Sequence, residues 1–488
     1  MRKLILKNSF FSVTQMLLKM AFLFILYRII YRELGVEELG LWSLTYAFLS
    51  FLDYASLGIP GGIVKFVAQY AARKKYTECS ELVQTSIMMM FGLSCMALLI
   101  GYPIVRLLLL QLVDSDTTLL LELLNLGAIA FILQMIYNSY VSVYDGFNQI
   151  YRRNIVSMVG ETIHFILSIV FIFRFGIIGV VYAKIIEHLI ILIGAVFVIP
   201  TFFKEMPYIP RVFKAKYLRE ILGYSLHFKV AGLMASLVNP LLRALINHYG
   251  GLGLVGYYEM AQKLVHKFSR LVAVALQSLF PTIAALKETD PDKMYTVYTM
   301  VFRVILSAVY PAMLLFGFAA PFISLVWLGE MSIIFSALVV VLSITYGSEI
   351  IKFPARLCMF GLGELKWIQI TNGITLALVT FLGSVGGVFF DGVGVVAGTS
   401  IALFISFNLL TVVFHRIHHI PLFSLISLKT KLVYLFLGIL YILLVHLYRG
   451  SFGDYFLTLY GGIGTTALIL VVAGAHKDMR MLIQGKKA

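Results

Sequence analysis

Apolar runs of about 20 residues recur from one end of this chain to the other, and they restrict its fold more than any other feature. At ~1.5 Å per residue, a helix of this length crosses a ~30 Å hydrocarbon core. The chain is 60% hydrophobic and 13% charged, and its mean hydropathy is +0.93. These values lie outside the range of soluble globular domains. The sequence therefore predicts an all-α polytopic membrane protein.

The apolar runs predict about 14 transmembrane helices. Their cores are expected near residues 8–31, 41–66, 86–110, 119–144, 155–174, 177–199, 221–248, 254–286, 297–327, 333–351, 367–390, 393–414, 430–447 and 455–474. The first run follows MRKLILKNSF without a small-residue cleavage site, so we interpret it as a retained helix and not as a signal peptide. The cysteines are scattered and form neither a disulfide framework nor a metal-ligand spacing. No metal or other cofactor is expected.

Basic residues follow the predicted topology. If both termini are cytoplasmic, the cytoplasmic segments carry basic runs such as 73–75, 152–153 and 204–219. The predicted external loops carry Arg32, Arg174 and Arg449. This asymmetry is that of the positive-inside rule. The net charge of +15 is therefore mostly topological, and no nucleic-acid partner is expected.

Two halves of the chain show a weak internal repeat. The first predicted span ends in LYRIIYRELG and the seventh ends in LLRALINHYG, and one shift places Arg28 on Arg243 and Gly35 on Gly250. The same shift places the glycine of YDGFNQ on that of MFGLGE. Between the halves, PTFFKEMPYIPRVFKAKYLRE has the proline spacing and basic charge of a cytoplasmic linker.

The repeat predicts two pseudo-symmetric six-helix bundles and a C-terminal helix pair. Their expected domains are residues 1–205, 206–420 and 421–488. Because each bundle has an even number of helices, both repeats share one orientation and their symmetry axis runs along the membrane normal. Transporters built in this way bind cargo near the midplane and alternate access by rocking.

The chain resembles bacterial polysaccharide-repeat flippases of the Wzx type, in the superfamily that also contains the MATE exporters and the lipid II flippase. In the first half the resemblance is carried by ELGVEELGLWSL, by DYASLG and by Lys65. In the second half it is carried by GLVGYYEMAQKL, by LFP at 279–281 and by glycine-led turns before the fifth and eleventh spans. The match covers residues 1 to 420. It implies a V-shaped pair of bundles that exports an undecaprenyl-diphosphate-linked oligosaccharide.

The sequence departs from this family at one position. Relatives often carry an acid just before the basic residue that ends the seventh span, whereas this chain has Leu242 before Arg243. Ion coupling through an acid at that point is therefore in doubt.

The eighth predicted span carries Lys263, His266, Lys267 and Arg270, which we call the cationic stripe. At 100° per residue the two lysines and the arginine fall within an arc of about 60°, and His266 widens it to about 100°. They lie roughly 14 to 24 Å from the outer end of the span. Inserting one such cation at mid-helix costs about 2.5 to 3.5 kcal/mol, so the cationic stripe is expected to face protein or water.

Two main interpretations of the cationic stripe are open. Carboxylates and carbonyls of neighbouring helices would neutralise a structural stripe, and a contact with a partner helix is a separate, third possibility. Alternatively, the stripe lines a hydrated cavity in which ammonium and guanidinium groups bind a diphosphate. The predicted spans contain fewer acids than bases, which favours the cavity.

Four further cations are candidate substrate-binding residues. Arg28 and Arg243 occupy equivalent positions in the repeat, close to the outer interface, where simple snorkelling is the alternative. Lys19 lies near the midplane of the first span, on the face opposite Arg28. Arg303 lies in the inner third of the ninth span, where it faces either the same cavity or cytoplasmic lipid phosphates.

The fifth and sixth spans carry candidate ion-coupling residues. Antiparallel packing is expected to bring Glu161 and His164 to the depth of Glu187 and His188. Buried Glu and His of this kind are typical of proton relays. The alternative is an internally paired structural cluster, completed by Lys184, that joins the two helices.

The second span combines a candidate coupling acid with a helix breaker. Asp53 is expected either to pair with Lys19 or to accept a coupling ion. The following GIPGG, residues 58–62, predicts a static kink or a gating hinge. Near the end of the second half, HRIHH at 415–419 has no acid or cysteine nearby, so we interpret it as interfacial charge and not as a metal site.

These features predict a secondary transporter and not an enzyme, since no Walker A sequence, zincin helix or nucleophile elbow occurs. We expect a flippase that exports undecaprenyl-diphosphate-linked oligosaccharide repeat units across the bacterial cytoplasmic (inner) membrane by alternating access. Expected partners are that lipid-linked oligosaccharide, membrane lipids, a polysaccharide polymerase and glycosyltransferases. The sugars, the coupling ion and the product (O-antigen, capsule or exopolysaccharide) stay open.

Three alternatives compete with this function. A lipid II-type flippase handles the same diphosphate. A MATE-like exporter of cationic drugs is disfavoured because a positive lumen repels such cargo. An intramembrane polysaccharide polymerase or ligase also handles diphosphate lipids, but it generally needs a larger external loop than any predicted here.

Overall fold

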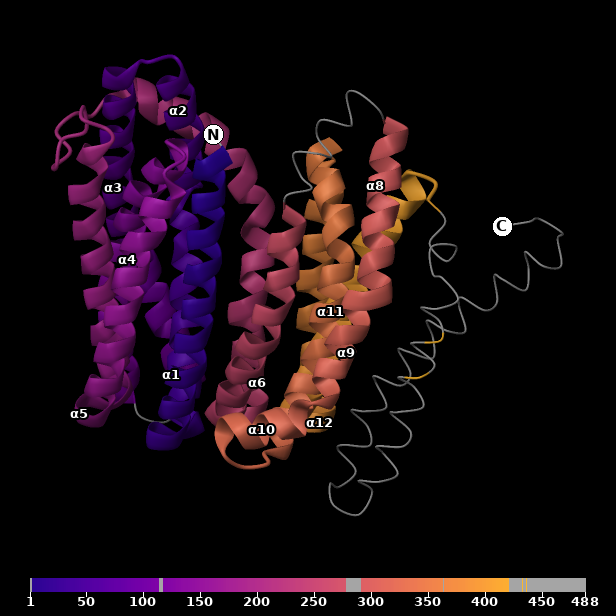
Figure 1. The fold of residues 1–488 in the computed structure, drawn as a ribbon. Helices are drawn as coiled ribbons and strands as arrows, with labels where there is room; N and C mark the ends of the chain where they lie inside the picture. The colour runs from indigo at the N-terminus through magenta and orange to yellow at the C-terminus, as the bar shows by residue number, and fades with distance from the viewer. Residues whose placement is uncertain are drawn as a thin grey trace. The chain divides into compact units, whose positions relative to one another are not determined.

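The computed structural model describes residues 2–113, 117–277, 291–362 and 364–420, together with Leu432 and Phe436. Within these ranges every regular element is helical, as predicted (Figure 1). Apart from Leu432 and Phe436, the last two predicted spans lie outside the described residues, as does the end of the eighth.

The chain folds into two compact units, Met1–Asn247 and His248–Ala488. The first contains α1 (Arg2–Phe51), η1 (Leu52–Ser56), α2 (Ile59–Ala72), α3 (Tyr76–Leu112), α4 (Thr117–Gly146), α5 (Ile150–Val198), η2 (Ile199–Thr201) and the start of α6 (Ala215–Gln277). The second contains the rest of α6, α8 (Pro291–Val304), η3 (Ile305–Val309), α9 (Tyr310–Phe318), α10 (Ala320–Leu328), α11 (Ile333–Leu362) and α12 (Leu365–Ile417). The sequence-based domain boundaries at 205 and 420 stay predictions.

Four internal breaks divide the longest helices and reveal the repeat in the backbone. Gly35 in α1 has φ 86° and ψ 172°, and Gly251 in α6 has φ 75° and ψ 173°. Gly176 in α5 has φ 58° and ψ −144°, and Asp391 in α12 has φ 52° and ψ −148°. Glycine takes these left-handed values at little cost, whereas an aspartate does so less readily. Matching conformations at matching places support the pseudo-symmetric halves.

Eight stretches of the described residues are helical, long enough and apolar enough to cross a membrane. They are Lys7–Leu34, Val36–Ala72, Tyr76–Leu112, Thr117–Gly146, Ile150–Thr201, Met294–Phe318, Ile333–Phe360 and Lys366–Ile417. Two of them, Ile150–Thr201 and Lys366–Ile417, each contain an internal break and correspond to a pair of predicted spans. α6 holds the seventh and eighth predicted spans but is not among the eight.

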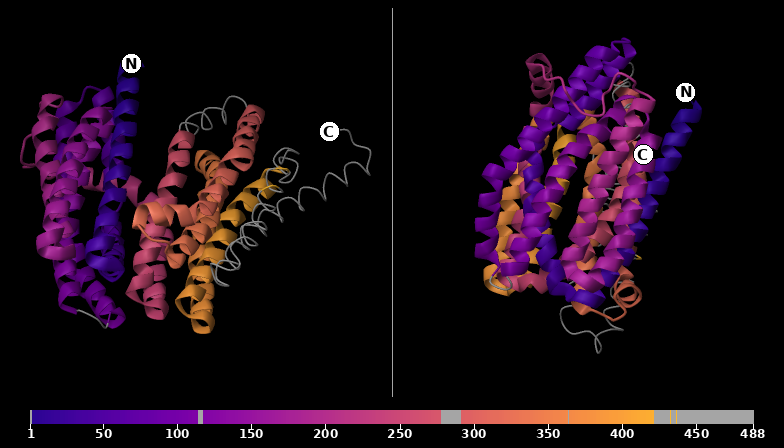
Figure 2. Two further views of the ribbon diagram at one scale, coloured as in Figure 1. Left: turned by 60° about the horizontal axis from the view of Figure 1, so that its bottom comes forward. Right: turned by 90° about the vertical axis from the view of Figure 1, so that its left-hand side faces the viewer.

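Packing in the first unit centres on α4 and α5. α5 packs against both α1 and α4, and α4 also packs against α2 and α3. These helices stand side by side in all the ribbon views (Figures 1 and 2). Their facing residues, such as Ile30, Val143 and Val181, are fully buried. Apolar residues such as Phe173 and Leu99 are exposed, as expected of helices that face lipid.

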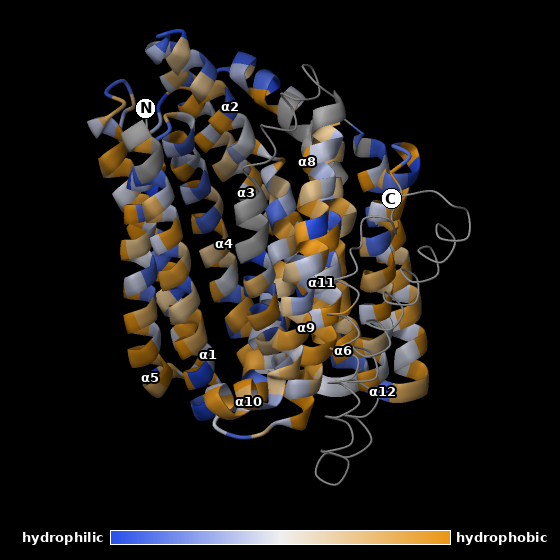
Figure 3. Cartoon of the chain, turned by 45° about the vertical axis from the view of Figure 1, so that its right-hand side comes forward, coloured by the Kyte–Doolittle hydropathy of each residue, from blue (hydrophilic) through white to orange (hydrophobic). Residues whose placement is uncertain are grey.

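The second unit is organised around α11, which packs against α9, α10 and α12. Hydrophobic residues line most of the length of the helices, and hydrophilic residues are more frequent near helix ends (Figure 3).

The predicted span 297–327 is not a single helix. A π-helical turn, η3, precedes Pro311, and the chain turns again at Ala319 before α10. Pro311 has no N–H for the regular α-helical bond, which accounts for the irregular turn.

The GIPGG segment breaks its helix completely. α1 ends at Phe51, and Leu57 and Gly58 both take left-handed φ values of 47° and 78°. α2 then starts with Pro60 in its first turn, where a missing N–H costs nothing. Asp53 consequently lies in the short η1 helix and not in a continuous span.

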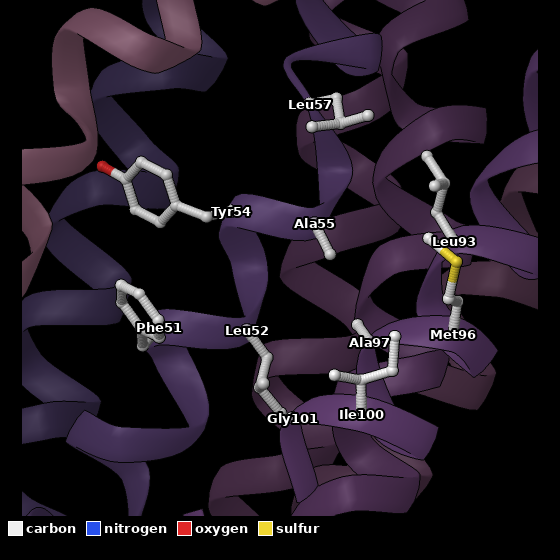
Figure 4. A pocket seen from close by; sticks show the side chains of 10 residues that line it. All are labelled: Phe51, Leu52, Tyr54, Ala55, Leu57, Leu93, Met96, Ala97, Ile100 and Gly101. Atoms are coloured by element: carbon white, nitrogen blue, oxygen red, sulfur yellow. The ribbon is translucent and has the colours of Figure 1, made fainter. Parts of the chain in front are cut away.

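A small cavity of about 280 Å³ lies beside this break, between η1 and α3 (Figure 4). Its lining is apolar apart from Tyr54, whose hydroxyl points away from the other lining side chains. Gly101 allows the close approach of Leu52, whose side chain would lie 2.4 Å from any added Cβ. The cavity has no group that would bind an anion.

The predicted linker is fastened to α3 through its backbone. Gln84 Oε1 accepts the N–H of Arg211 at 2.8 Å, and Ser80 Oγ donates to the carbonyl of Glu205 at 2.7 Å. Thr85 Oγ1 accepts the N–H of Lys214 at 3.2 Å. These bonds satisfy peptide groups that lack helical partners.

Side chains at the start of α6 reinforce this attachment. Glu81 of α3 forms an ion pair with Lys214 and accepts a 3.1 Å hydrogen bond from Tyr217. Tyr70 of α2 donates to Glu220 at 3.3 Å. The linker is thus an ordered part of the first unit.

Candidate functional site

The cationic stripe lies on α6 after the break at Gly251 and follows GLVGYYEMAQKL. Lys263 Nζ lies 3.3 Å from Glu259 Oε1, one helical turn away. The Glu259 side chain is 6% exposed, whereas that of Lys263 is 40% exposed. One cation of the stripe is therefore partly neutralised by an acid of its own helix, and not by one of a neighbouring helix.

One edge of the cationic stripe contacts α11. The ring of the half-buried His266 lies 5.2 Å from that of Tyr346, edge to face. Gln262, on the same side, donates to the Tyr346 hydroxyl at 2.7 Å. Glu349 of α11 is close enough to act electrostatically on His266. Tyr346 and Gln262 are thus part of the surroundings of the stripe, and sequence reasoning had not selected either.

The remaining members of the cationic stripe differ in exposure. Lys267 is half-buried and interacts with neighbouring groups, whereas Arg270 is exposed. Glu259 carries one negative charge, and Lys263, Lys267 and Arg270 carry three positive charges. The stripe itself remains cationic, and an exposed guanidinium at its end is suited to a bidentate contact with phosphate.

The four further cations lie in different environments. Arg243 is 6% exposed and donates from Nε to Ser43 Oγ at 2.9 Å and from a terminal nitrogen to the Asn239 carbonyl at 3.4 Å. Arg28 is half-buried and also interacts with neighbouring groups. Arg303 is exposed on the last turn of α8, directly before the π-helical η3. Arg243 is held inside the first unit by these contacts.

Lys19 pairs with Glu161. Its ammonium lies 2.9 Å from Glu161 Oε1, which also accepts a 3.1 Å hydrogen bond from Gln15. Lys19 and Gln15 lie one turn apart on α1, whereas Glu161 lies on α5. The half-buried Asp53 also interacts with a neighbouring group. Lys19 thus pairs with Glu161 and not with Asp53, the partner that the sequence suggested.

The other candidate coupling residues come together as antiparallel packing required. Glu187 Oε2 lies 2.7 Å from Lys184 Nζ and 3.5 Å from His164 Nδ1. His188 Nδ1 lies 2.9 Å from the Ala130 carbonyl of α4. The break at Gly176 turns α5 back on itself and so places these residues face to face. The internal pairing that was the alternative to a relay is therefore present, and a coupling role stays a prediction.

The HRIHH segment is more deeply buried than interfacial charge would be. His415 is 4% exposed and lies 2.6 Å from the Tyr298 hydroxyl of α8. His418 lies 2.8 Å from the Tyr295 hydroxyl and 3.3 Å from Glu364. The prediction of interfacial charge was wrong for these two histidines, because α8 supplies tyrosines that no local pattern could reveal. The network joins tyrosines of α8 to Glu364, just before α12 begins, and to His415 and His418, where α12 ends.

Comparison with known proteins gives the family and the fold. A family model described as polysaccharide biosynthesis protein matches residues 5–287. No match was found among curated proteins.

Three solved structures illustrate the similarity of fold. The lipid II flippase MurJ in an inward closed conformation is 14% identical, with a TM-score of 0.68 over 97% of this chain and 99% of that one. An inward-facing multidrug resistance MATE family transporter of the MOP superfamily is 17% identical, with a TM-score of 0.66 over 82% and 96%. A MOP superfamily transporter from Pyrococcus furiosus Vc1 (DSM3638), described as having a binding pocket of reverse polarity, is 17% identical, with a TM-score of 0.57 over 85% and 96%.

These TM-scores and coverages show that the chain shares the all-α, multi-pass fold of these transporters, as the sequence resemblance implied. The family match covers more than half of the chain and includes α1 to α6, with the cationic stripe. The chain belongs to the polysaccharide biosynthesis protein family.

Proposed function

We propose that this protein is a flippase that moves undecaprenyl-diphosphate-linked oligosaccharide repeat units across the bacterial cytoplasmic membrane by alternating access. Membership of the polysaccharide biosynthesis protein family and the transporter fold support this proposal. The proposal includes cytoplasmic termini, as the positive-inside pattern favours. Glycosyltransferases would supply the lipid-linked oligosaccharide, and a polysaccharide polymerase would consume it.

The cationic stripe is the observation that carries the proposal. Three permanent cations lie on one face of α6, and Glu259 of the same helix pairs with Lys263. A diphosphate has at least two negative charges, which such a stripe would bind through charge-assisted hydrogen bonds. The isoprenoid tail would stay in the bilayer while the head group crosses.

The competing functions fit this arrangement less well. A MATE-like exporter of organic cations would present a repulsive face to its cargo. For the Pyrococcus furiosus transporter, a binding pocket of reverse polarity is taken to suggest a different function. A lipid II-type flippase remains the second candidate, because MurJ is similar in fold and lipid II carries the same diphosphate.

Reconstitution tests the proposed function. Proteoliposomes would carry fluorescent undecaprenyl-diphosphate oligosaccharides, and flipping would be measured by accessibility to an external quencher. We expect the triple variant Lys263→Gln/Lys267→Gln/Arg270→Gln to flip at least about 10-fold more slowly, since each charge-assisted hydrogen bond contributes about 1.5–3 kcal/mol.

A second triple variant, Arg73→Gln/Lys74→Gln/Lys75→Gln, removes the same charge from the turn between α2 and α3 and should flip at the native rate. Undiminished flipping by the first triple variant would reject the proposed site. Comparing this oligosaccharide with lipid II as cargo separates the two candidate functions.

A further inference from the structure

The Lys19–Glu161 pair combines an exposed cation with a buried acid. The Lys19 side chain is 52% exposed, whereas that of Glu161 is 8% exposed. Both of the partners of Glu161, Lys19 and Gln15, contact the same oxygen, Oε1. The other oxygen, Oε2, is buried without a hydrogen-bond partner. A charged carboxylate in this position therefore depends on Lys19.

Within the residues that the structure describes, no nearby cation is placed to take over from Lys19. Lys184 donates to Glu187 at 2.7 Å, and His164 Nδ1 also faces Glu187. His164 lies one turn from Glu161 on α5, and its Nε2 is a second buried atom without a partner. His188 lies against the Ala130 carbonyl.

Tyrosines from two further segments complete the surroundings. Tyr46 lies on α1 after the break at Gly35, and Tyr137 lies on α4. Both are close enough to Glu187 for an electrostatic interaction, and Tyr137 also interacts electrostatically with Glu161 and Asp53. Among the described residues, the titratable groups around the pair include Asp53 of η1, Tyr137 of α4, and His164, Lys184, Glu187 and His188 of α5. Removing the Lys19 charge would leave Glu161 as an uncompensated buried anion, a strongly unfavourable state unless it takes up a proton.

We propose that an anionic lipid head group and Glu161 compete for Lys19, so that head-group binding is linked to protonation of Glu161. When the head group takes the ammonium, Glu161 Oε1 loses its cation and the carboxylate binds one proton from solvent. When the head group leaves, Glu161 releases that proton and pairs with Lys19 again. This proposal rests on the proposed function for the identity of the anion, a lipid-linked diphosphate.

Linkage makes the effect reciprocal. If head-group binding favours protonation of Glu161, then protonation of Glu161 strengthens head-group binding by the same factor. Lowering the pH should therefore strengthen binding, beyond the change caused by titration of the diphosphate itself. A purely structural ion pair would show no such linkage.

Calorimetry of the full-length protein in nanodiscs tests the exchange, with undecaprenyl diphosphate as the probe. Titrations in two buffers of different ionisation enthalpy measure the protons taken up per ligand bound, between about pH 5.5 and about pH 8. Because the terminal phosphate itself releases protons when it binds cations, the expected result is a difference: the native protein takes up more protons per ligand than Glu161→Gln at the same pH. Because glutamine does not hold the ammonium as an ion pair, Glu161→Gln should also bind about 10-fold more tightly near pH 8.

Variants of Lys19 provide the second arm. Lys19→Gln should bind about 10-fold more weakly, and Lys19→Arg should keep both affinity and proton uptake. If Lys19→Gln fails to fold because Glu161 is left unpaired, Lys19→Gln/Glu161→Gln removes that strain and should bind weakly without the extra uptake. Glu78→Gln, which removes a carboxylate from the exposed pair with Lys75, should behave as the native protein.

The outcomes separate this inference from the proposed function. Equal proton uptake by Glu161→Gln and the native protein, or native affinity in Lys19→Gln, would overturn the exchange and leave the role of the cationic stripe standing. Failure of the native protein to bind undecaprenyl diphosphate would overturn both.

Discussion

The Lys184–Glu187 pair illustrates how this protein tolerates charge at membrane depth. Glu187 is 3% exposed and has Lys184 and His164 as its partners. Removing one partner from a buried ion pair leaves an uncompensated charge, whereas replacing both by apolar residues is often neutral. We therefore expect the loss of one partner to lower the stability of the protein strongly, and the replacement of both partners to change it little.

Lys184→Met should lower the free energy of unfolding by about 3–5 kcal/mol, because Glu187 stays buried without its ammonium partner. The double variant Lys184→Met/Glu187→Leu should recover most of this loss. Thermal unfolding in detergent measures both. Lys75 and Glu78 have the same spacing in sequence and lie 3.0 Å apart but are exposed, so Lys75→Met should change stability by less than about 1 kcal/mol. Equal effects of the two single variants would contradict this account.

Some contacts of the buried charged residues could be predicted from the sequence, and others could not. The approach of His164 to Glu187 followed from spacing and antiparallel packing, both visible in the sequence. The choice of Glu161 as the partner of Lys19 did not, because several acids lie at similar depth and side-chain geometry decides between them. The partners of His415 and of the Arg243 guanidinium were likewise out of reach, since Tyr298 and Ser43 lie far away in the chain.

At the scale of elements, α12 shows how glycine sets the distance between two helical segments. The chain reverses at Phe390 and Asp391, and the segments on either side approach through Gly386 and Gly394. A Cβ at Gly394 would lie 2.0 Å from the carbonyl oxygen of Gly386. Small residues allow such close backbone contact in membrane helices. Because the obstacle is backbone, the contact cannot relax by a rotamer change.

Gly394→Ala should therefore destabilise the protein by about 1–3 kcal/mol or more through overpacking. Gly92→Ala in α3 is the matched control, because nothing lies within 4 Å of the added Cβ. In a helix interior, alanine is favoured over glycine by about 1 kcal/mol, so this control should be neutral or stabilising. Thermal unfolding of the two variants decides the matter. A harmless Gly394→Ala would show that the two segments are not packed through this glycine.

At the scale of the whole molecule, the linker between the halves is an ordered segment. Gln84 and Thr85 of α3 hold its backbone at Arg211 and Lys214, and Glu81 holds the first turn of α6. Proline spacing indicated a linker, but it did not indicate that α3 binds it.

Gln84→Ala/Thr85→Val should increase trypsin cleavage after Arg211 or Lys214 by about 10-fold, since two or more hydrogen bonds of about 1 kcal/mol each are lost. Limited proteolysis followed by mass spectrometry measures the rate and the site. Thr380→Val, which removes a hydroxyl bonded only within its own helix, should leave cleavage unchanged. Unaltered cleavage in the double variant would mean that other contacts hold the linker.

The sequence by itself determined the helical fold class, the extent of most described spans, the repeat and the family. These properties depend on local composition, on apolar run length and on glycines at chain reversals, all of which act over short distances along the chain. Only the tertiary structure decided which partner each buried charge takes, where GIPGG ends a helix and how the linker is held. Such pairings depend on packing between segments far apart in sequence, and differences of a few ångströms select one partner over another.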